Sequence, residues 1–179
     1  LHPRVRRQRQ MCIRDRDFYG NFLVVVKAFA YLTMLGREGV HEVGRNAVLN
    51  ANYMMAALKD TYDMAYPGPC MHEFVMTLDR LHKETGVSAL DIAKGLLDNG
   101  IHPPTMYFPL IVHEALMVEP TETESKATMD EAIAVFRSLA RLAHEDPDAL
   151  HTAPHNTPVR RLDEVQAARN PVLRAALAE

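Results

Sequence analysis

The chain has 179 residues, of which 47% are hydrophobic and 24% charged, and its formal net charge is −3. This composition predicts a globular, soluble protein with one main domain. Its two cysteines are too few for a disulfide framework, which indicates a reducing cytoplasm, and no apolar run reaches the roughly 18 residues that span a bilayer.

The first 16 residues form a basic arm, with six arginines against one acidic residue. Such an arm can tether a protein to nucleic acid or to a membrane. We favour a different origin, because Met11–Asp15 back-translates as ATG-TGT-ATA-AGA-GAC, which resembles the transposase adapter of shotgun sequencing libraries read in frame. Residues 1–16 are therefore expected to be non-native, with the authentic protein cut just before Phe18. No nucleic-acid or membrane partner is expected.

Two helices are predicted next. The segment Gly20–Leu35 is apolar on almost every side, which indicates a helix buried by several partners. Its valines would also suit a strand, but its length favours a helix, and Gly36 is the expected stop. A second helix is predicted from about Glu38 to Tyr62, because residues suited to a core recur there at steps of three and four.

A strand and a short helix follow the helix-breaking cluster Tyr66–Pro69. The strand is predicted over Cys70–Leu78, with alternate residues on opposite faces. One face is expected to hold Phe74, Met76 and Leu78, and the other Glu73, Val75 and Thr77. Ser88 is a good N-cap for an amphipathic helix over Ala89–Leu97, which an Asn-Gly pair ends. The apolar stripe of this helix is expected to comprise Leu90, Ala93, Leu96 and Leu97.

Two further strands and a long helix complete the predicted domain. The strands are Met106–Val112 and Ala115–Val118, and Pro109 places the first at an edge or entry position. The helix begins between residues 123 and 128, where Thr128 and Glu131 have capping-box spacing, and it ends before residue 147. Its core stripe is expected to comprise Ile133, Phe136, Leu139, Ala140 and Ala143. These elements describe a small α+β domain with a proline-punctuated tail.

Two polar segments are candidates for a functional site. In the first, two prolines between His102 and Thr105 can hold an imidazole and a hydroxyl in one geometry. The second is an acidic turn that puts Glu119 or Thr121 at the edge of a site, because strand ends commonly face clefts. A plainer interpretation stays open for each: a structural turn with an incidental histidine, and carboxylates attracted to the positive end of a helix.

No metal site is predicted, although the chain holds nine histidines. The dipeptides His72-Glu73 and His113-Glu114 lack the second histidine four residues on that a zinc-binding helix needs. His151 and His155 are four residues apart, but Pro154 lies between them in a segment that is not helical. Scattered surface or core histidines account for this pattern better.

Six stretches of the chain carry a resemblance to a known family. They are Leu49–Met54, Met71–Phe74, Asp91–Lys94, Gly100–Pro109, Met117–Glu122 and Ala153–Glu164. In this order they resemble the glycine dehydrogenase P-protein, most closely the second, cofactor-bearing subunit of the two-subunit bacterial form. The resemblance covers about residues 18–174, and six matches together are far more specific than any one alone.

The resemblance implies a fold-type-I pyridoxal-phosphate enzyme, with this chain as its small C-terminal α+β domain. Residues 17–37 are then expected to be the last, apolar helix of a truncated large domain, and residues 38–146 the small domain. Residues 147–179 are expected to be a tail, with Arg160 and Arg161, that packs on a partner subunit. His102, Thr105, Glu119 and Thr121 are the candidate site-lining residues.

The reaction implied by the resemblance is decarboxylation of glycine, with transfer of the aminomethyl group to the lipoyl arm of the H-protein. Pyridoxal phosphate is the implied cofactor, and a companion subunit 1 is the implied partner. The lysines of this chain are Lys27, Lys59, Lys83, Lys94 and Lys126. None of them has the glycine-rich setting of the family's cofactor lysine, which is expected upstream. The chain alone is therefore predicted to hold no catalytic residue and to be inactive.

Two alternatives stay open from the sequence. The first is a non-catalytic α+β interaction module that binds a partner through its long apolar helix. The second is the C-terminal domain of another fold-type-I enzyme, an aminotransferase or an amino-acid decarboxylase. Those families usually place a substrate-binding arginine near the strand end around Met117, and Leu116–Glu119 contains none.

Overall fold

The computed structural model describes residues 21–174, so the expectations for residues 1–16 lie outside the described part of the chain. The chain divides into two compact units, Leu1–Gly44 and Arg45–Glu179. Helix α2 (Phe22–Leu58) has residues in both units and is broken at Gly36, where φ is 65° and ψ is −175°. Glycine adopts this left-handed φ without a Cβ clash, so the predicted stop at Gly36 is confirmed as a break between two helical segments.

The segment of α2 before Gly36 is helical and strongly apolar, and its apolar side chains are exposed. Phe22, Leu23, Phe29 and Met34 are between 70% and 86% exposed. The predicted burial of this helix by several partners is therefore not found among residues 21–174. Its assignment to a preceding large domain remains a prediction.

A four-stranded antiparallel sheet lies in the second unit, in the order β1-β2-β4-β3. The strands are β1 (Asp63–Met64), β2 (Phe74–Thr77), β3 (Thr105–Met106) and β4 (Ala115–Val118). β2 pairs with β4 from Phe74↔Val118 to Thr77↔Ala115, and β3 pairs with β4 on its other side. The central pair therefore brings segments about 40 residues apart in the sequence to adjacent positions.

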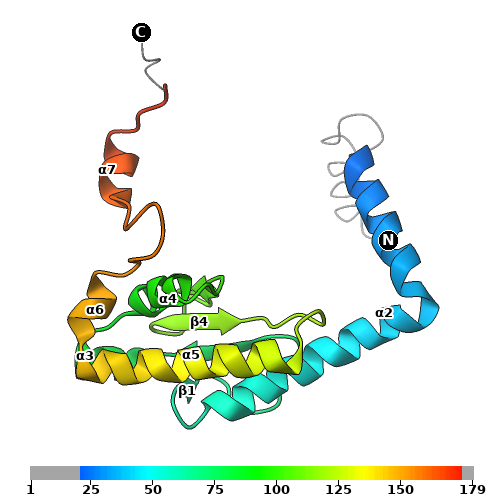
Figure 1. The fold of residues 1–179 in the computed structure, drawn as a ribbon, viewed down its shortest axis with the longest axis horizontal. Coiled ribbons are helices and arrows are strands. Elements are labelled where there is room, and N and C mark those ends of the chain that lie inside the picture. The colour runs from blue at the N-terminus through cyan, green and yellow to red at the C-terminus, as the bar shows by residue number, and fades with distance from the viewer. Residues whose placement is uncertain (1–20, 175–179) are drawn as a thin grey trace, which may run out of the picture. The chain divides into compact units, whose positions relative to one another are not determined.

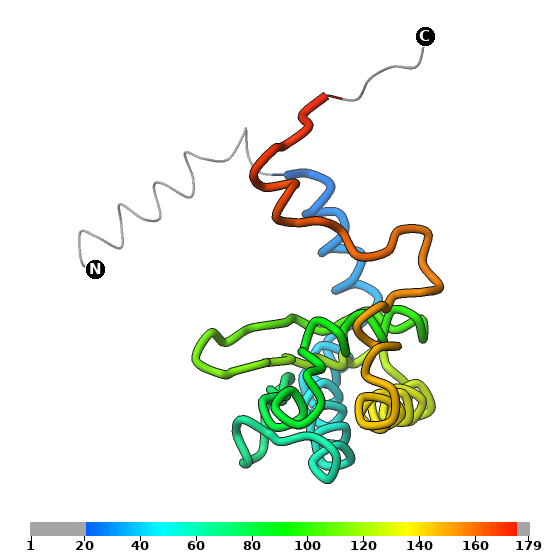
Figure 2. Tube along the Cα trace, turned by 90° about the vertical axis from the view of Figure 1, so that its left-hand side faces the viewer, coloured from blue at the N-terminus to red at the C-terminus, as the bar shows by residue number. Residues whose placement is uncertain are grey.

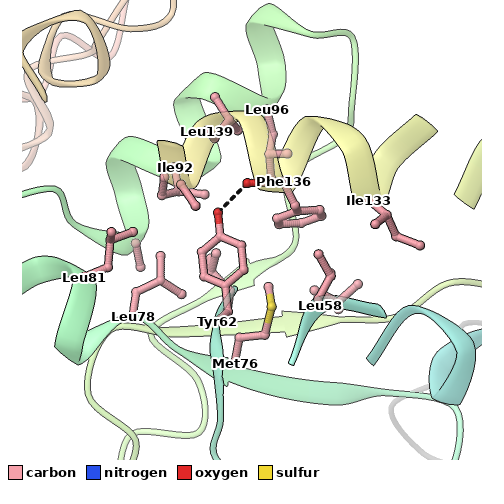
Figure 3. Packing of buried hydrophobic residues seen from close by; sticks show 14 of the residues in the cluster. Leu58, Tyr62, Met76, Leu78, Leu81, Ile92, Leu96, Ile133, Phe136 and Leu139 are labelled. Atoms are coloured by element: carbon pink, nitrogen blue, oxygen red, sulfur yellow. Dashed lines mark hydrogen bonds between the residues drawn. The ribbon is translucent and has the colours of Figure 1, made fainter. Parts of the chain in front are cut away.

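Over the described residues of this unit, five further helices follow α2: α3 (Asp79–Thr85), α4 (Ala89–Asp98), α5 (Lys126–Glu145), α6 (Pro147–His151) and α7 (Glu164–Arg169). α5 runs alongside residues 45–58 of α2, the part of that helix that lies in this unit, and in the same direction (Figure 1). Tyr62, just after α2, lies in the middle of the core (Figure 3). Its hydroxyl donates to the carbonyl of Phe136 at 2.7 Å, and their rings meet edge to face at 6.1 Å. Burial raises the pKa of Tyr62.

Two predicted strands are wrong in part. The first is shorter than predicted, and its alternation fails because Phe74, Val75 and Met76 are all buried. Met106–Val112 is not a strand beyond Met106. Pro109 has no N–H to give to a ladder, and its carbonyl instead accepts a turn hydrogen bond from the Val112 N–H at 2.9 Å.

The helix boundaries follow local capping chemistry. The predicted Ser88 cap is confirmed as a capping box, in which Ser88 and Asp91 each accept the other's backbone N–H. The Thr128–Glu131 box is wrong, because Ser125 is the N-cap of α5 and accepts the N–H of Thr128 at 3.1 Å. The core stripe predicted for α5 is confirmed at all five positions. The stripe of α4 is centred differently: it buries Ala89, Ile92, Ala93 and Leu96, while Leu90 and Leu97 are half-buried.

The tail begins by folding back onto α4. The Arg161 guanidinium donates to the Asp91 carboxylate at 2.6 Å and to the carbonyl of Ala153 at 2.7 Å. The Asp98 carboxylate accepts the backbone N–H groups of His155 and Asn156 at 2.6 to 2.8 Å. The Arg161 guanidinium thus binds its own chain, and the packing of the tail on a companion subunit remains a prediction. Over residues 21–174, no helix combines the length and the apolar composition needed to cross a membrane.

Candidate functional site

A groove of about 730 Å³ opens between the end of the sheet and the first turns of α5. Its apolar lining comes from Met54 of α2, Val118 of β4, and Met129 and Phe136 of α5, all of which are buried. The segments 99–105 and 117–120 form its other walls. A concave, mostly apolar surface with a few polar groups at its rim is the usual form of a small-molecule site.

The groove brings together three of the four candidate site residues. His102, Thr105 and Glu119 all line it, and all three are exposed at its rim. Glu124 and Glu131 add two further carboxylates to the lining. An imidazole and a hydroxyl can each donate or accept a hydrogen bond, so this rim can bind and orient a polar group while the floor holds an apolar one.

The turn carrying His102 is fixed at both ends. Gly100, with φ 73°, ends α4, and the Ile101 N–H donates to the carbonyl of Leu96 at 3.0 Å. After the two prolines, Thr105 pairs with Met117 in the sheet. Because prolines remove backbone freedom between these two fixed points, His102 is presented from a rigid segment.

Thr121 does not line the groove. Its hydroxyl shares a hydrogen bond of 2.7 Å with that of Thr123, and its carbonyl accepts one of 2.8 Å from the Asn50 side-chain amide. Asn50 is buried on α2 and also donates to the carbonyl of Glu124 at 3.4 Å. Asn50 therefore positions the acidic turn against α2. This role of Asn50 was not identified from the sequence; a lone amide among the recurring core positions of the helix was the available signal.

A second polar group at the groove edge was not foreseen. Ligand atoms of His72, Glu73 and Glu119 all lie within 4.8 Å of one another. The three side chains meet because Phe74 pairs with Val118 in antiparallel strands. Glu73 directly precedes Phe74 and Glu119 directly follows Val118, so the two glutamates lie at the same end of the pair. From the sequence, His72-Glu73 was considered only as a dipeptide, because the third member, Glu119, directly follows another strand, β4. Partly exposed groups of this kind are common on protein surfaces, and this one supports no metal site by itself.

The described residues offer no lysine to the groove. Lys83 pairs with Asp79 at 2.5 Å, and Lys126 pairs with Asp130 at 2.6 Å. None of the five lysines of the chain lines the groove. A pyridoxal-phosphate site needs an amine that forms a Schiff base, so the residues of this groove do not fit a covalent cofactor site by themselves.

Comparison with known proteins agrees with the resemblance seen in the sequence. Residues 43–156 match the family model described as "Glycine dehydrogenase, C-terminal domain". The chain is 60% identical over 161 residues to "Probable glycine dehydrogenase (decarboxylating) subunit 2" of Treponema denticola, covering 90% of this chain and 33% of that protein. It is 55% identical to the protein of the same name from Thermosipho africanus, over 89% of this chain and 33% of the relative.

A third relative of the same name, from Thermotoga petrophila, is 53% identical over 90% of this chain and 34% of its own length. The chain thus spans about a third of the length of the relatives that it matches. The family match covers the sheet, the groove and α3 to α6, which are the parts that build the candidate site. The chain belongs to the glycine dehydrogenase family and carries its C-terminal domain.

Proposed function

We propose that this chain is the C-terminal third of subunit 2 of a two-subunit glycine decarboxylase. The parent enzyme would remove carbon dioxide from glycine and transfer the aminomethyl group to the lipoyl arm of the H-protein. The observation that carries the proposal is identity of 53–60% to relatives named for this activity, over about nine tenths of the chain. Companion subunit 1, the H-protein, a fold-type-I architecture and a cytoplasmic location are parts of the same proposal.

The domain would supply one wall of the active site. Bound pyridoxal phosphate would act as an electron sink for the carbanion left when carbon dioxide departs. The chain's own contribution is the groove: a rim of His102, Thr105 and Glu119 that orients polar groups, and an apolar floor that excludes water. The lysine that anchors the cofactor would come from the preceding two thirds of the parent, because no lysine lines the groove.

Cofactor attachment tests the division of labour. The purified 179-residue chain is incubated with pyridoxal phosphate, reduced with borohydride and analysed by peptide mass spectrometry. We expect no specific lysine to be modified, whereas the full-length parent should be modified at one lysine outside this domain. A single, stoichiometric adduct on a lysine of this chain would overturn the assignment.

The role of His102 is tested in the full-length enzyme. His102→Ala should lower the rate of glycine–bicarbonate exchange at least tenfold, as loss of a positioned polar group does in an active site. The matched control is His82→Ala, which alters an exposed histidine of α3 outside the groove. Equal exchange rates in the two variants would show that His102 belongs to a structural turn and has no role in the active site.

A further inference from the structure

The loop that joins β3 to β4, Tyr107–Glu114, is built as a rigid projection. At its base the Tyr107 N–H donates to the carbonyl of Ala115 at 2.9 Å, and the Thr77 hydroxyl donates to the carbonyl of His113 at 2.7 Å. The Glu114 carboxylate accepts the Ala89 N–H, at the start of α4, at 2.5 Å. The loop is therefore fastened to both the sheet and α4.

The backbone at both ends of the loop is held in an unfavourable conformation. Tyr107 has φ 56° and Glu114 has φ 48°, in the left-handed region that residues other than glycine rarely adopt. Such conformations persist where the surrounding structure imposes them. The hydrogen bonds at the base hold both residues in these conformations, and within the tip the Val112 N–H donates to the carbonyl of Pro109 at 2.9 Å.

The tip presents apolar side chains to solvent. Leu110 and Ile111 are 87% and 84% exposed, and Tyr107 and Phe108 are 42% and 53% exposed. Figure 2 shows the loop as the yellow-green hairpin that projects away from α4 and α5. A contiguous exposed apolar surface on a rigid support is typical of a contact site, because little conformational entropy is lost when it is covered.

We propose that this loop docks into an apolar surface of the preceding two thirds of its own parent polypeptide. The inference rests on the proposed function, in which this chain is the last third of a protein three times as long. At the observed exposures, four large side chains offer on the order of 500 Å². A stable interface between separate chains needs about 800 Å² from each partner, whereas a covalently linked partner is present at an effective concentration in the millimolar range. The small area therefore favours an intrachain partner over a second copy or the companion subunit.

Thiol protection tests the docking. Ile111→Cys is introduced into the 179-residue chain and into the full-length parent without its companion, and labelling by a maleimide is followed on the peptide that contains residue 111. We expect the thiol to react at least tenfold more slowly in the full-length chain, at every protein concentration. Leu173→Cys, at a tail position that is 87% exposed, is the matched control and should react at similar rates in both.

A second variant measures the contribution of the loop to stability rather than its exposure to solvent. Leu110→Ser with Ile111→Ser should lower the urea midpoint of the full-length chain and leave that of the 179-residue chain unchanged. Val172→Ser with Leu173→Ser, at positions that are 89% and 87% exposed, should change neither.

Equal labelling of residue 111 in the short and full-length chains would overturn the proposal. Protection that appears only when companion subunit is added, or that grows with concentration of the full-length chain, would assign the loop to another chain and would also overturn it. Neither readout uses glycine, pyridoxal phosphate or exchange activity. A failure of the proposed function therefore leaves these results interpretable on their own.

Discussion

At the scale of single residues, the Asp91 carboxylate connects three parts of the fold. It accepts the backbone N–H of Ser88 at 2.8 Å, the Arg161 guanidinium at 2.6 Å, and lies 3.3 Å from Nδ1 of His151. Burial alone would raise the pKa of Asp91, but the hydrogen bonds from Ser88 and Arg161 outweigh it and hold that pKa below its ordinary value of 3.8. One ionised side chain thus caps α4 and fastens α6 and the tail to it.

Replacing this carboxylate should weaken the domain in a pH-dependent way. Asp91→Asn should cost about 2 kcal/mol at pH 7, below the range for a fully buried pair because Arg161 is a third exposed. A carboxyl whose pKa is lowered in the folded state contributes stability above pH 3.8 that is lost as pH falls through the folded value. The difference between variant and parent should therefore shrink below about pH 4.

Urea titrations at pH 7 and pH 3 measure this difference in the free energy of unfolding. Asp148→Asn, at an exposed position on α6, is the control and should change stability by a few tenths of a kcal/mol. An Asp91→Asn variant that is as stable as the control at pH 7 would show that the three contacts of this carboxylate do not contribute to the free energy of unfolding.

The contacts that sequence reasoning found at this scale are the local ones. Ser88 and Asp91 are three residues apart, and their spacing alone predicts a helix start. Arg161 reaches Asp91 across 70 positions, and Asn50 reaches Thr121 across 71. No periodicity encodes such pairs, because the tertiary fold brings them together. The same holds for Glu119 beside Glu73, although His102 and Thr105 could be proposed from their rigid proline setting.

At the scale of elements, Gly95 sets how closely α4 packs on its neighbours. A Cβ built at Gly95 would lie 2.8 Å from Cδ2 of Leu139 on α5 and 3.0 Å from Cδ2 of Leu150 on α6. Both leucines are almost completely buried, so their methyl groups have little room to move. The close contact of the three helices therefore requires a residue without a side chain.

Gly95→Ala should destabilise the domain by about 1 kcal/mol, because overpacking outweighs the gain of up to about 1 kcal/mol in helix propensity. Gly44→Ala is the matched control, since Gly44 also lies within a helix, α2, but nothing lies within 4 Å of its added Cβ. The control should be neutral or stabilising. The urea midpoints of both variants are compared with that of the unchanged chain. A raised midpoint for Gly95→Ala would contradict the prediction and show that the helices can move apart at little cost.

Element prediction succeeded where one periodicity extends over several turns. The α5 stripe spans most of a 20-residue helix, and all five of its predicted core positions are buried. β1 was missed because two residues carry no pattern, and α3 because its only buried residue is Leu81 among polar neighbours. The prediction of a strand over Met106–Val112 is wrong for a different reason. The apolar composition of this segment suggested a strand, whereas Pro109 forms part of a turn.

At the scale of the whole molecule, the two units differ in how much of their apolar surface is buried. The buried residues of α2 begin at Asn50, and the core clusters around the sheet, α4 and α5. Before Gly36 the same helix leaves Phe22, Leu23 and Phe29 largely in water. Surface of this kind drives association when its natural covering is absent.

Removing residues 1–44 should therefore leave stability intact and reduce association. The shortened chain is expected to keep the urea midpoint of the 179-residue chain, since no side chain that the structure describes before Asn50 is fully buried. It should remain monomeric in sedimentation experiments at concentrations where the longer chain associates. Removing residues 1–16 alone is the control, because it separates the effect of the basic arm from that of the apolar helix.

The outcome also separates the two classes of function considered from the sequence. A 179-residue chain that is already a clean, cooperative monomer would favour a self-sufficient interaction module, because its apolar helix would then need no covering. Association that disappears with residues 17–44, and not with residues 1–16, indicates a helix shaped to pack against further polypeptide. A lowered urea midpoint after the full deletion would contradict the division at residue 44, since the removed helix would then contribute to the stability of the domain.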